Sequence, residues 1–137
     1  MAKYFLDTST WIKRYSGEPE VEKVDKIIEA HSIAILDLEI PELISNLFRL
    51  FNENHLTEEE LEEILSIVYS DIANFTIVKY KEKHLFDFEH LCRKMRQTAI
   101  DGMILLCAKE LDNITIITSD KRLKAGAKLE GLKVEFI

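Results

Sequence analysis

The sequence has few of the residues on which common cofactor and metal motifs depend. It contains only two cysteines, four glycines and two prolines among 137 residues. Cys92 and Cys107 lack the paired spacing of a zinc or redox motif, so we expect both to be reduced thiols in the core. The glycines are scattered and form neither a phosphate-binding loop nor a dinucleotide fingerprint. These absences argue against nucleotide-cofactor and zinc chemistry of the familiar kinds.

Long hydrophobic runs and an excess of positive charge are also missing. No apolar stretch approaches the length of a membrane span, and the few apolar residues between Lys3 and Asp7 are too short for a signal peptide. We therefore expect a cytoplasmic protein without membrane contact, folded as one domain over residues 1–137. The net charge of −7 argues against broad electrostatic binding of nucleic acid. Cations bound at a cluster of acids would reverse that field locally.

Short, β-branched apolar runs alternate along the chain with longer segments of helical periodicity. The sequence predicts strands at residues 3–6, 33–36, 75–79, 114–118 and 132–137. It predicts helices at residues 8–15, 19–30, 37–54, 58–73, 81–97, 98–111 and 121–129. In the segment 81–97 the apolar face is expected to comprise Leu85, Phe88, Leu91, Cys92 and Met95. The alternation indicates an α/β protein, a three-layer α/β/α sandwich around a central parallel sheet of about five strands.

Four acidic residues occupy comparable places in this pattern. Asp7 and Asp120 come at the ends of apolar strands, whereas Glu42 and Asp101 lie in the opening turns of helices. Each also has a purely local explanation. Asp7 and Asp120 have the residue type that caps a helix N-terminus. Glu42 is an ordinary first-turn acid, and Asp101 completes a capping box with Thr98.

The expected topology brings these acids together. If the strand order reverses beside the first strand, the fourth strand becomes its neighbour, and Asp7 meets Asp120 at the carboxyl edge of the sheet. Glu42 and Asp101 can converge on the same edge. Closely packed carboxylates repel one another unless a cation intervenes, and Mg²⁺ or Mn²⁺ suits such ligands. Because these ions activate water against a phosphodiester, metal-dependent phosphodiester hydrolysis is the leading enzymatic hypothesis.

The segments that carry the four acids resemble the ordered acidic motifs of PIN-domain nucleases. They are residues 6–9, 41–43, 100–108 and 116–123. The resemblance implies a catalytic, metal-binding role for four residues, namely Asp7, Glu42, Asp101 and Asp120. It also implies that Thr118, with Ser9, supports the site through its hydroxyl group.

A chain of this size is similar to the VapC-type toxins of type II toxin–antitoxin systems. Those proteins are Mg²⁺-dependent endoribonucleases, commonly dimers, that a cognate antitoxin blocks. The resemblance therefore implies an RNA substrate, an antitoxin partner, a homodimer and a Mg²⁺ cofactor, which Mn²⁺ can replace. One departure concerns Asp37 and Glu39, two further acids where small or hydroxyl residues are more usual. We expect Glu42 to face the site because Leu43 and Leu47 follow it at the expected places.

Other functions stay open. A housekeeping RNA-processing nuclease would use the same acids. A phosphatase with Asp7 as nucleophile would need a second acid two residues on, where Ser9 stands. A receiver-like module would need an acid after the third strand, and a non-catalytic RNA-binding module would be expected to have lost at least one of the four acids. The basic residues beside Asp120 either guide an RNA backbone or form a solvated helix face. They are Lys121, Arg122, Lys124 and Lys128.

Overall fold

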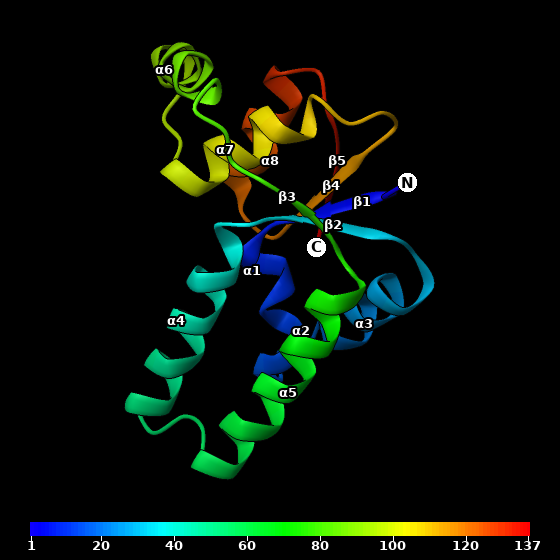
Figure 1. The fold of residues 1–137 in the computed structure, drawn as a ribbon, viewed down its shortest axis with the longest axis vertical. Helices are drawn as coiled ribbons and strands as arrows, with labels where there is room; N and C mark the ends of the chain where they lie inside the picture. The colour runs from blue at the N-terminus through cyan, green and yellow to red at the C-terminus, as the bar shows by residue number, and fades with distance from the viewer.

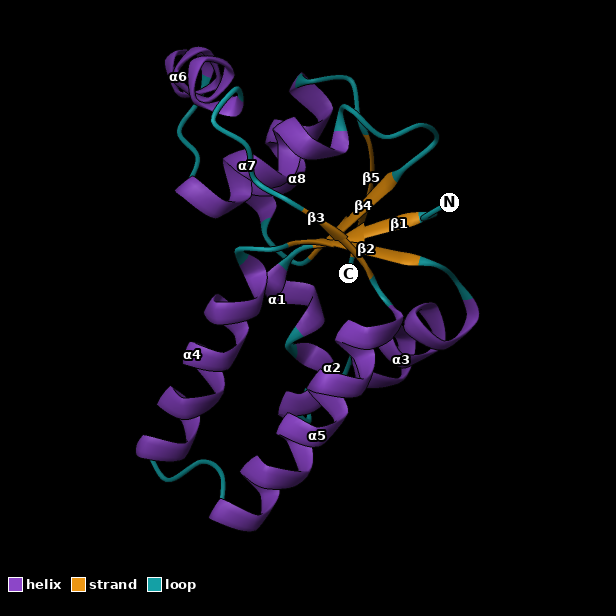
Figure 2. Ribbon diagram, in the orientation of Figure 1, coloured by secondary structure: helices purple, strands orange, loops and turns teal.

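The computed structural model describes residues 1–137 as a five-stranded sheet between two layers of helices (Figure 1, Figure 2). The strands are β1 (Tyr4–Leu6), β2 (Ile33–Leu36), β3 (Thr76–Val78), β4 (Thr115–Thr118) and β5 (Lys133–Phe136). The helices on one face of the sheet are α1 (Thr8–Trp11), α2 (Lys13–Ser16), α3 (Val21–Ala30), α4 (Glu39–Asn52) and α5 (Glu58–Asn74). Those on the other face are α6 (His84–Lys94), α7 (Ala99–Ala108) and α8 (Lys121–Leu129). The predicted fold class is confirmed.

All strand pairs are parallel, and the strand order is β3-β2-β1-β4-β5. The order reverses beside β1, which meets the condition set in the sequence analysis, because β1 pairs with β2 on one side and with β4 on the other. Leu6 is in register with Ile117, so Asp7 and Thr118 follow at the same edge. The switch point of the sheet therefore coincides with the predicted acidic residues.

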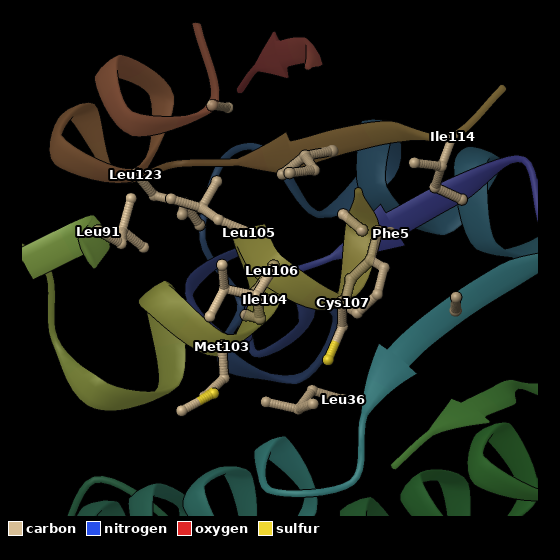
Figure 3. Close-up of a cluster of buried hydrophobic side chains, with 14 residues drawn as sticks. Phe5, Leu36, Leu91, Met103, Ile104, Leu105, Leu106, Cys107, Ile114 and Leu123 are labelled. Carbon is tan, nitrogen blue, oxygen red and sulfur yellow. The ribbon is translucent and has the colours of Figure 1, made fainter. Parts of the chain in front are cut away.

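The strands are continuous apolar runs because both faces of the sheet are covered. Successive side chains enter opposite layers, so Phe5 packs beneath α7 while Leu6 packs against the α1–α5 side. Ile116 and Ile117 divide in the same way. Figure 3 shows the first of these cores, in which α7 is buried at every position from Gly102 to Ala108. Because both faces of the sheet are buried under helices, the register of the strands is fixed, and with it the position of the residues at the carboxyl edge.

Element boundaries differ from the predictions where short turns intervene. The predicted helix 8–15 divides into α1 and α2, and α2 is capped by Gly17, whose φ of 71° favours glycine. The predicted helix 81–97 is shorter, and its predicted apolar face is correct at Leu91 and Phe88 but wrong at Leu85, which is 55% exposed, and at Cys92, which is also exposed. His84 and Leu91 are the buried residues of α6, which rotates the buried stripe away from Leu85. Cys107 is buried as expected.

A buried ion pair joins α5 to α2 on the opposite side of the molecule from α6–α8. Arg14 donates from Nε and Nη2 to the two carboxylate oxygens of Asp71, at 2.8 and 3.0 Å. The Tyr15 hydroxyl also donates to Asp71, and it accepts a hydrogen bond from Trp11 Nε1 at 2.8 Å. Asp25 contacts the same guanidinium at 3.1 Å. The α4–α5 hairpin is therefore anchored to the segment that follows β1.

None of the helices combines the length and the apolarity that crossing a membrane requires.

Candidate functional site

A cavity of about 290 Å³ lies at the carboxyl edge of the sheet, and all four predicted acids line it. Asp7 follows β1, Asp120 follows β4, and Glu42 and Asp101 lie in the first turns of α4 and α7. The remaining lining residues are Thr8, Ser9, Ile12, Asn46 and Thr98. Segments from four parts of the chain thus meet where the sequence places the site.

Asp7 is the most buried acid of the cavity, with 1% of its surface exposed. Its Oδ1 accepts the backbone N–H of Thr10 at 3.0 Å, which makes Asp7 the N-cap of α1. Its Oδ2 accepts hydrogen bonds from the hydroxyls of Ser9, at 2.7 Å, and Thr118, at 2.6 Å. Burial raises the pKa of Asp7, and these hydrogen bonds oppose the rise. The carboxyl group is therefore held rigidly by donors, none of which carries a charge.

Thr118 and Ser9 also connect β1 to the loop after β4. Thr118 Oγ1 accepts the backbone N–H of Asp120 at 2.9 Å, and Ser9 Oγ accepts that of Ser119 at 3.3 Å. Asp120 caps α8 through Oδ1 alone, which accepts two backbone N–H groups at 2.7 and 3.2 Å. Its Oδ2 has no hydrogen bond within the protein. Helix capping and a role in the cavity are thus compatible for Asp120.

Asp101 and Glu42 complete the acidic lining. Thr98 caps α7 by accepting the backbone N–H of Asp101 at 3.3 Å. Burial, followed by the negative charges of Asp7 and Asp120, raises the pKa of Asp101 to about 6. The charges of Asp7 and Asp120 thus lie near enough to Asp101 to disfavour its ionised form.

Among the acids of segment 37–42, only Glu42 lines the cavity, as expected. Asp37 is engaged elsewhere, because its Oδ1 accepts the backbone N–H groups of Leu38 and Tyr80 at 2.9 and 3.1 Å. Glu42 is therefore the member of this acidic segment that lies where the predicted site is.

Glu39 is a buried acid beside the cavity that the sequence reasoning left without a role. It is fully buried, its Oε2 accepts the backbone N–H of Leu36 at 2.7 Å, and its Oε1 accepts the Thr8 hydroxyl at 3.4 Å. Burial, with the nearby charges of Asp7 and Glu42, raises the pKa of Glu39 well above its ordinary value. Glu39 thus joins the turn after β2 to the turn after β1. Its position three residues before Glu42, on the same helix, was the available signal.

Asn46 and Thr98 are further lining residues that the sequence reasoning did not place in the site. Asn46 lies four residues after Glu42, so helical periodicity places both side chains on one face of α4. Thr98 was considered only as a helix cap, and it occupies the cavity wall as well.

No positive side chain offsets this concentration of acids. None of the four carboxylates lies within 4.0 Å of a lysine or arginine nitrogen in the ion pairs of the structure. An all-oxygen donor set is what Mg²⁺ or Mn²⁺ prefers, so the residues fit a hard divalent cation. In the present rotamers no three acidic, histidine or cysteine side chains converge on one point, so ligation requires the carboxylates to reorient.

Comparison with known proteins defines the class to which this fold and acidic edge belong. The PIN domain profile matches residues 4–129, and the chain belongs to the PIN-domain family. Membership of this family supports a nuclease, an enzyme that hydrolyses nucleic acid. None of the functionally curated proteins compared with the chain matches it.

Several solved structures share the fold at low sequence identity. PAE2754 from Pyrobaculum aerophilum is 19% identical, with a TM-score of 0.70 over 97% of this chain and 89% of that chain. DNA-bound VapBC from Salmonella typhimurium is 18% identical, with a TM-score of 0.70 over 99% of this chain and 98% of that chain. The sarcin-ricin loop cleaving toxin VapC20 from Mycobacterium tuberculosis is 14% identical, with a TM-score of 0.66 over 89% and 93%.

Proposed function

We propose that this protein is a Mg²⁺-dependent endoribonuclease that hydrolyses RNA phosphodiester bonds and acts as the toxin of a type II toxin–antitoxin pair. One observation carries the proposal: four carboxyl groups line a single cavity at the switch point of the sheet, and no cationic side chain neutralises them. Repulsion among them is relieved when a divalent cation binds. Membership of the PIN-domain family supports the same chemistry.

The proposed roles follow from the positions of the side chains. Asp7, Glu42, Asp101 and Asp120 would hold Mg²⁺, for which Mn²⁺ can substitute. Thr118 and Ser9 hold Asp7 Oδ2 in place through their hydroxyls. Bound Mg²⁺ supplies Lewis acidity, which lowers the pKa of water and stabilises charge on a phosphodiester.

The toxin role and the partners rest on the structural neighbours. VapBC from Salmonella typhimurium and FitAcB from Neisseria gonorrhoeae have similar folds. We extend to this chain a cognate antitoxin that blocks cleavage. We also infer a homodimer, because apolar side chains are exposed on the α4–α5 hairpin. They are Phe48, Ile67 and Tyr69.

Cleavage of a mixed, structured RNA pool tests the proposed activity. Wild-type protein is incubated with Mg²⁺, with Mn²⁺ or with excess chelator, beside Asp7→Asn. We expect cleavage that requires metal and that falls roughly a thousandfold in Asp7→Asn, because loss of a ligand removes several kcal/mol of transition-state stabilisation. Asp87→Asn is the matched control, since Asp87 is exposed on α6 and remote from the cavity. Full activity in Asp7→Asn, or cleavage that persists in chelator, contradicts the proposal.

A further inference from the structure

Helix α8 carries an unusual concentration of free positive charge in an acidic protein. The chain has a net charge of −7, yet the nine residues of α8 include four cations and no acid. They are Lys121, Arg122, Lys124 and Lys128. None of the four takes part in an ion pair. Their charges are therefore available to a ligand of opposite sign.

Three of these lysines line a second cavity, of about 330 Å³, together with an aromatic ring. Lys121, Lys124 and Lys128 lie at helical spacing on one face of α8. Phe136, at the end of β5, also lines this cavity and is 37% exposed. The Lys124 ammonium group lies 5.1 Å from the centre of this ring, a cation–π contact. We call these four residues the lysine–phenylalanine patch.

The patch adjoins the acidic cavity. Phe136 is the register partner of Thr118 on the neighbouring strand, and the following backbone N–H, of Ile137, donates to the Thr118 carbonyl at 2.9 Å. Paired strands lie about 5 Å apart. Lys121 directly follows Asp120, which lines the acidic cavity. A polymer that enters the acidic cavity from this side must therefore pass over α8 and Phe136.

The chemistry of the patch matches one kind of polymer. Lysine side chains contact backbone phosphates without reading sequence, and an exposed aromatic ring stacks on an unpaired base. In a duplex the faces of the bases are covered by their neighbours, so a ring of this kind is suited to single strands.

We propose that the lysine–phenylalanine patch binds a single-stranded RNA segment that flanks the phosphodiester to be cleaved. The proposal rests on the nuclease function proposed above. On binding, the lysine ammonium groups pair with phosphates, and a base takes the place of the Lys124 ammonium group over the Phe136 ring. The patch thereby selects unpaired RNA and sets the direction in which the strand crosses the acidic cavity.

Binding of a labelled oligouridylate of about twelve nucleotides, followed by fluorescence anisotropy in excess chelator, tests the proposal. The triple variant Lys121→Gln/Lys124→Gln/Lys128→Gln is compared with Lys23→Gln/Lys26→Gln/Lys79→Gln, which removes three exposed lysines elsewhere. We expect the patch variant to bind at least about tenfold more weakly than wild type. Its slope of log affinity against log salt should be shallower by about two, because each lost phosphate contact removes about 0.7. The control triple should change affinity less than about twofold.

Phe136 variants test the stacking contact separately. Phe136→Leu keeps an apolar side chain and should bind about tenfold more weakly, whereas Phe136→Tyr should bind like wild type. Thermal unfolding of each variant verifies that the fold is intact.

Three results would overturn the proposal: no measurable binding by the wild type, equal affinities of the two triple variants, or equally effective competition by duplex RNA or an acidic peptide. Because the assay contains no metal and no cleavage, its outcome is independent of the nuclease test. If the patch does not bind RNA, the proposal of metal-dependent cleavage is unaffected. If no cleavage is found, the result of the binding experiment is still valid.

Discussion

Asp7 and Asp71 are both buried carboxyl groups, but their surroundings differ in kind. Asp71, 7% exposed, is held by the Arg14 guanidinium and the Tyr15 hydroxyl. Asp7, 1% exposed, receives only hydroxyl and backbone donors and faces other acids. The charge of a buried carboxylate that has a cationic partner is neutralised within the protein. A buried carboxylate without such a partner can instead bind an external cation. The partner, and not burial itself, distinguishes the structural acid from the candidate functional acid.

Of the substitutions considered, the removal of Asp71 from its pair with Arg14 should have the largest effect on stability. Asp71→Asn removes the buried carboxylate that binds the largely buried Arg14 guanidinium at two points and leaves Arg14 only its more exposed acidic neighbours, so we expect the free energy of unfolding to fall by about 3 kcal/mol. Urea denaturation of wild type and variant measures the change. Asp25→Asn is the matched control, because Asp25 also contacts Arg14 but has 38% of its side chain exposed, and it should cost less than about 1 kcal/mol. Equal losses in the two variants would show that Asp71 is no more than a surface partner.

Replacing a buried acid that has no cationic partner should instead raise the stability of the protein. Glu39 has no cationic partner, and burial raises its pKa well above the ordinary value. A raised folded-state pKa means that stability is full below the unfolded pKa and is lost as pH rises through the folded pKa. Each unit of difference costs about 1.4 kcal/mol. In Glu39→Gln the Oε1 can accept the Leu36 N–H while the Nε2 donates to the Thr8 hydroxyl, so the substitution should stabilise the apoprotein near pH 8.

Denaturation across pH verifies the Glu39 prediction. The stability difference between Glu39→Gln and wild type should vanish near pH 4 and grow with rising pH. Glu62→Gln, a change at an exposed position of α5, should leave the pH dependence unaltered. If Glu39→Gln were less stable than wild type at every pH, the prediction would be wrong. Glu39 would then be ionised and stabilised by a partner other than those described.

Much of the fold follows from local patterns in the sequence. The alternation of apolar strands with helical segments is enough to predict a parallel sheet, whereas the switch point at β1 could only be assumed, as the place that would bring Asp7 and Asp120 together. Boundaries were less accurate. Leu85 was assigned to a buried stripe because it fits the helical period, but that period does not determine which stripe faces the core. The buried face of α6 instead includes His84, which contacts Lys81 and Glu110 at 3.1 and 2.7 Å. Helical periodicity does not reveal these contacts.

The site was predictable to the extent that its acids occupy equivalent places in successive strand–helix units. Asp7, Glu42, Asp101 and Asp120 share one cavity as expected. Glu39 was not given a role, because whether an acid in a first turn faces solvent or the interior depends on the neighbouring turn at Thr8. The pairing of Asp71 with Arg14 spans 57 residues of sequence, and local reasoning has no access to it.

Calorimetric titration with Mn²⁺ tests most directly the claim that the acidic cavity holds a divalent cation. Wild type should bind Mn²⁺ near pH 7, and affinity should fall about tenfold near pH 5, because Asp101, whose pKa is about 6, must lose its proton to act as a ligand. Asp7→Asn and Asp120→Asn should bind at least about tenfold more weakly, while Asp87→Asn matches wild type. Mn²⁺ affinity in Asp7→Asn equal to that of wild type would contradict the account, because the acids would then only cap helices.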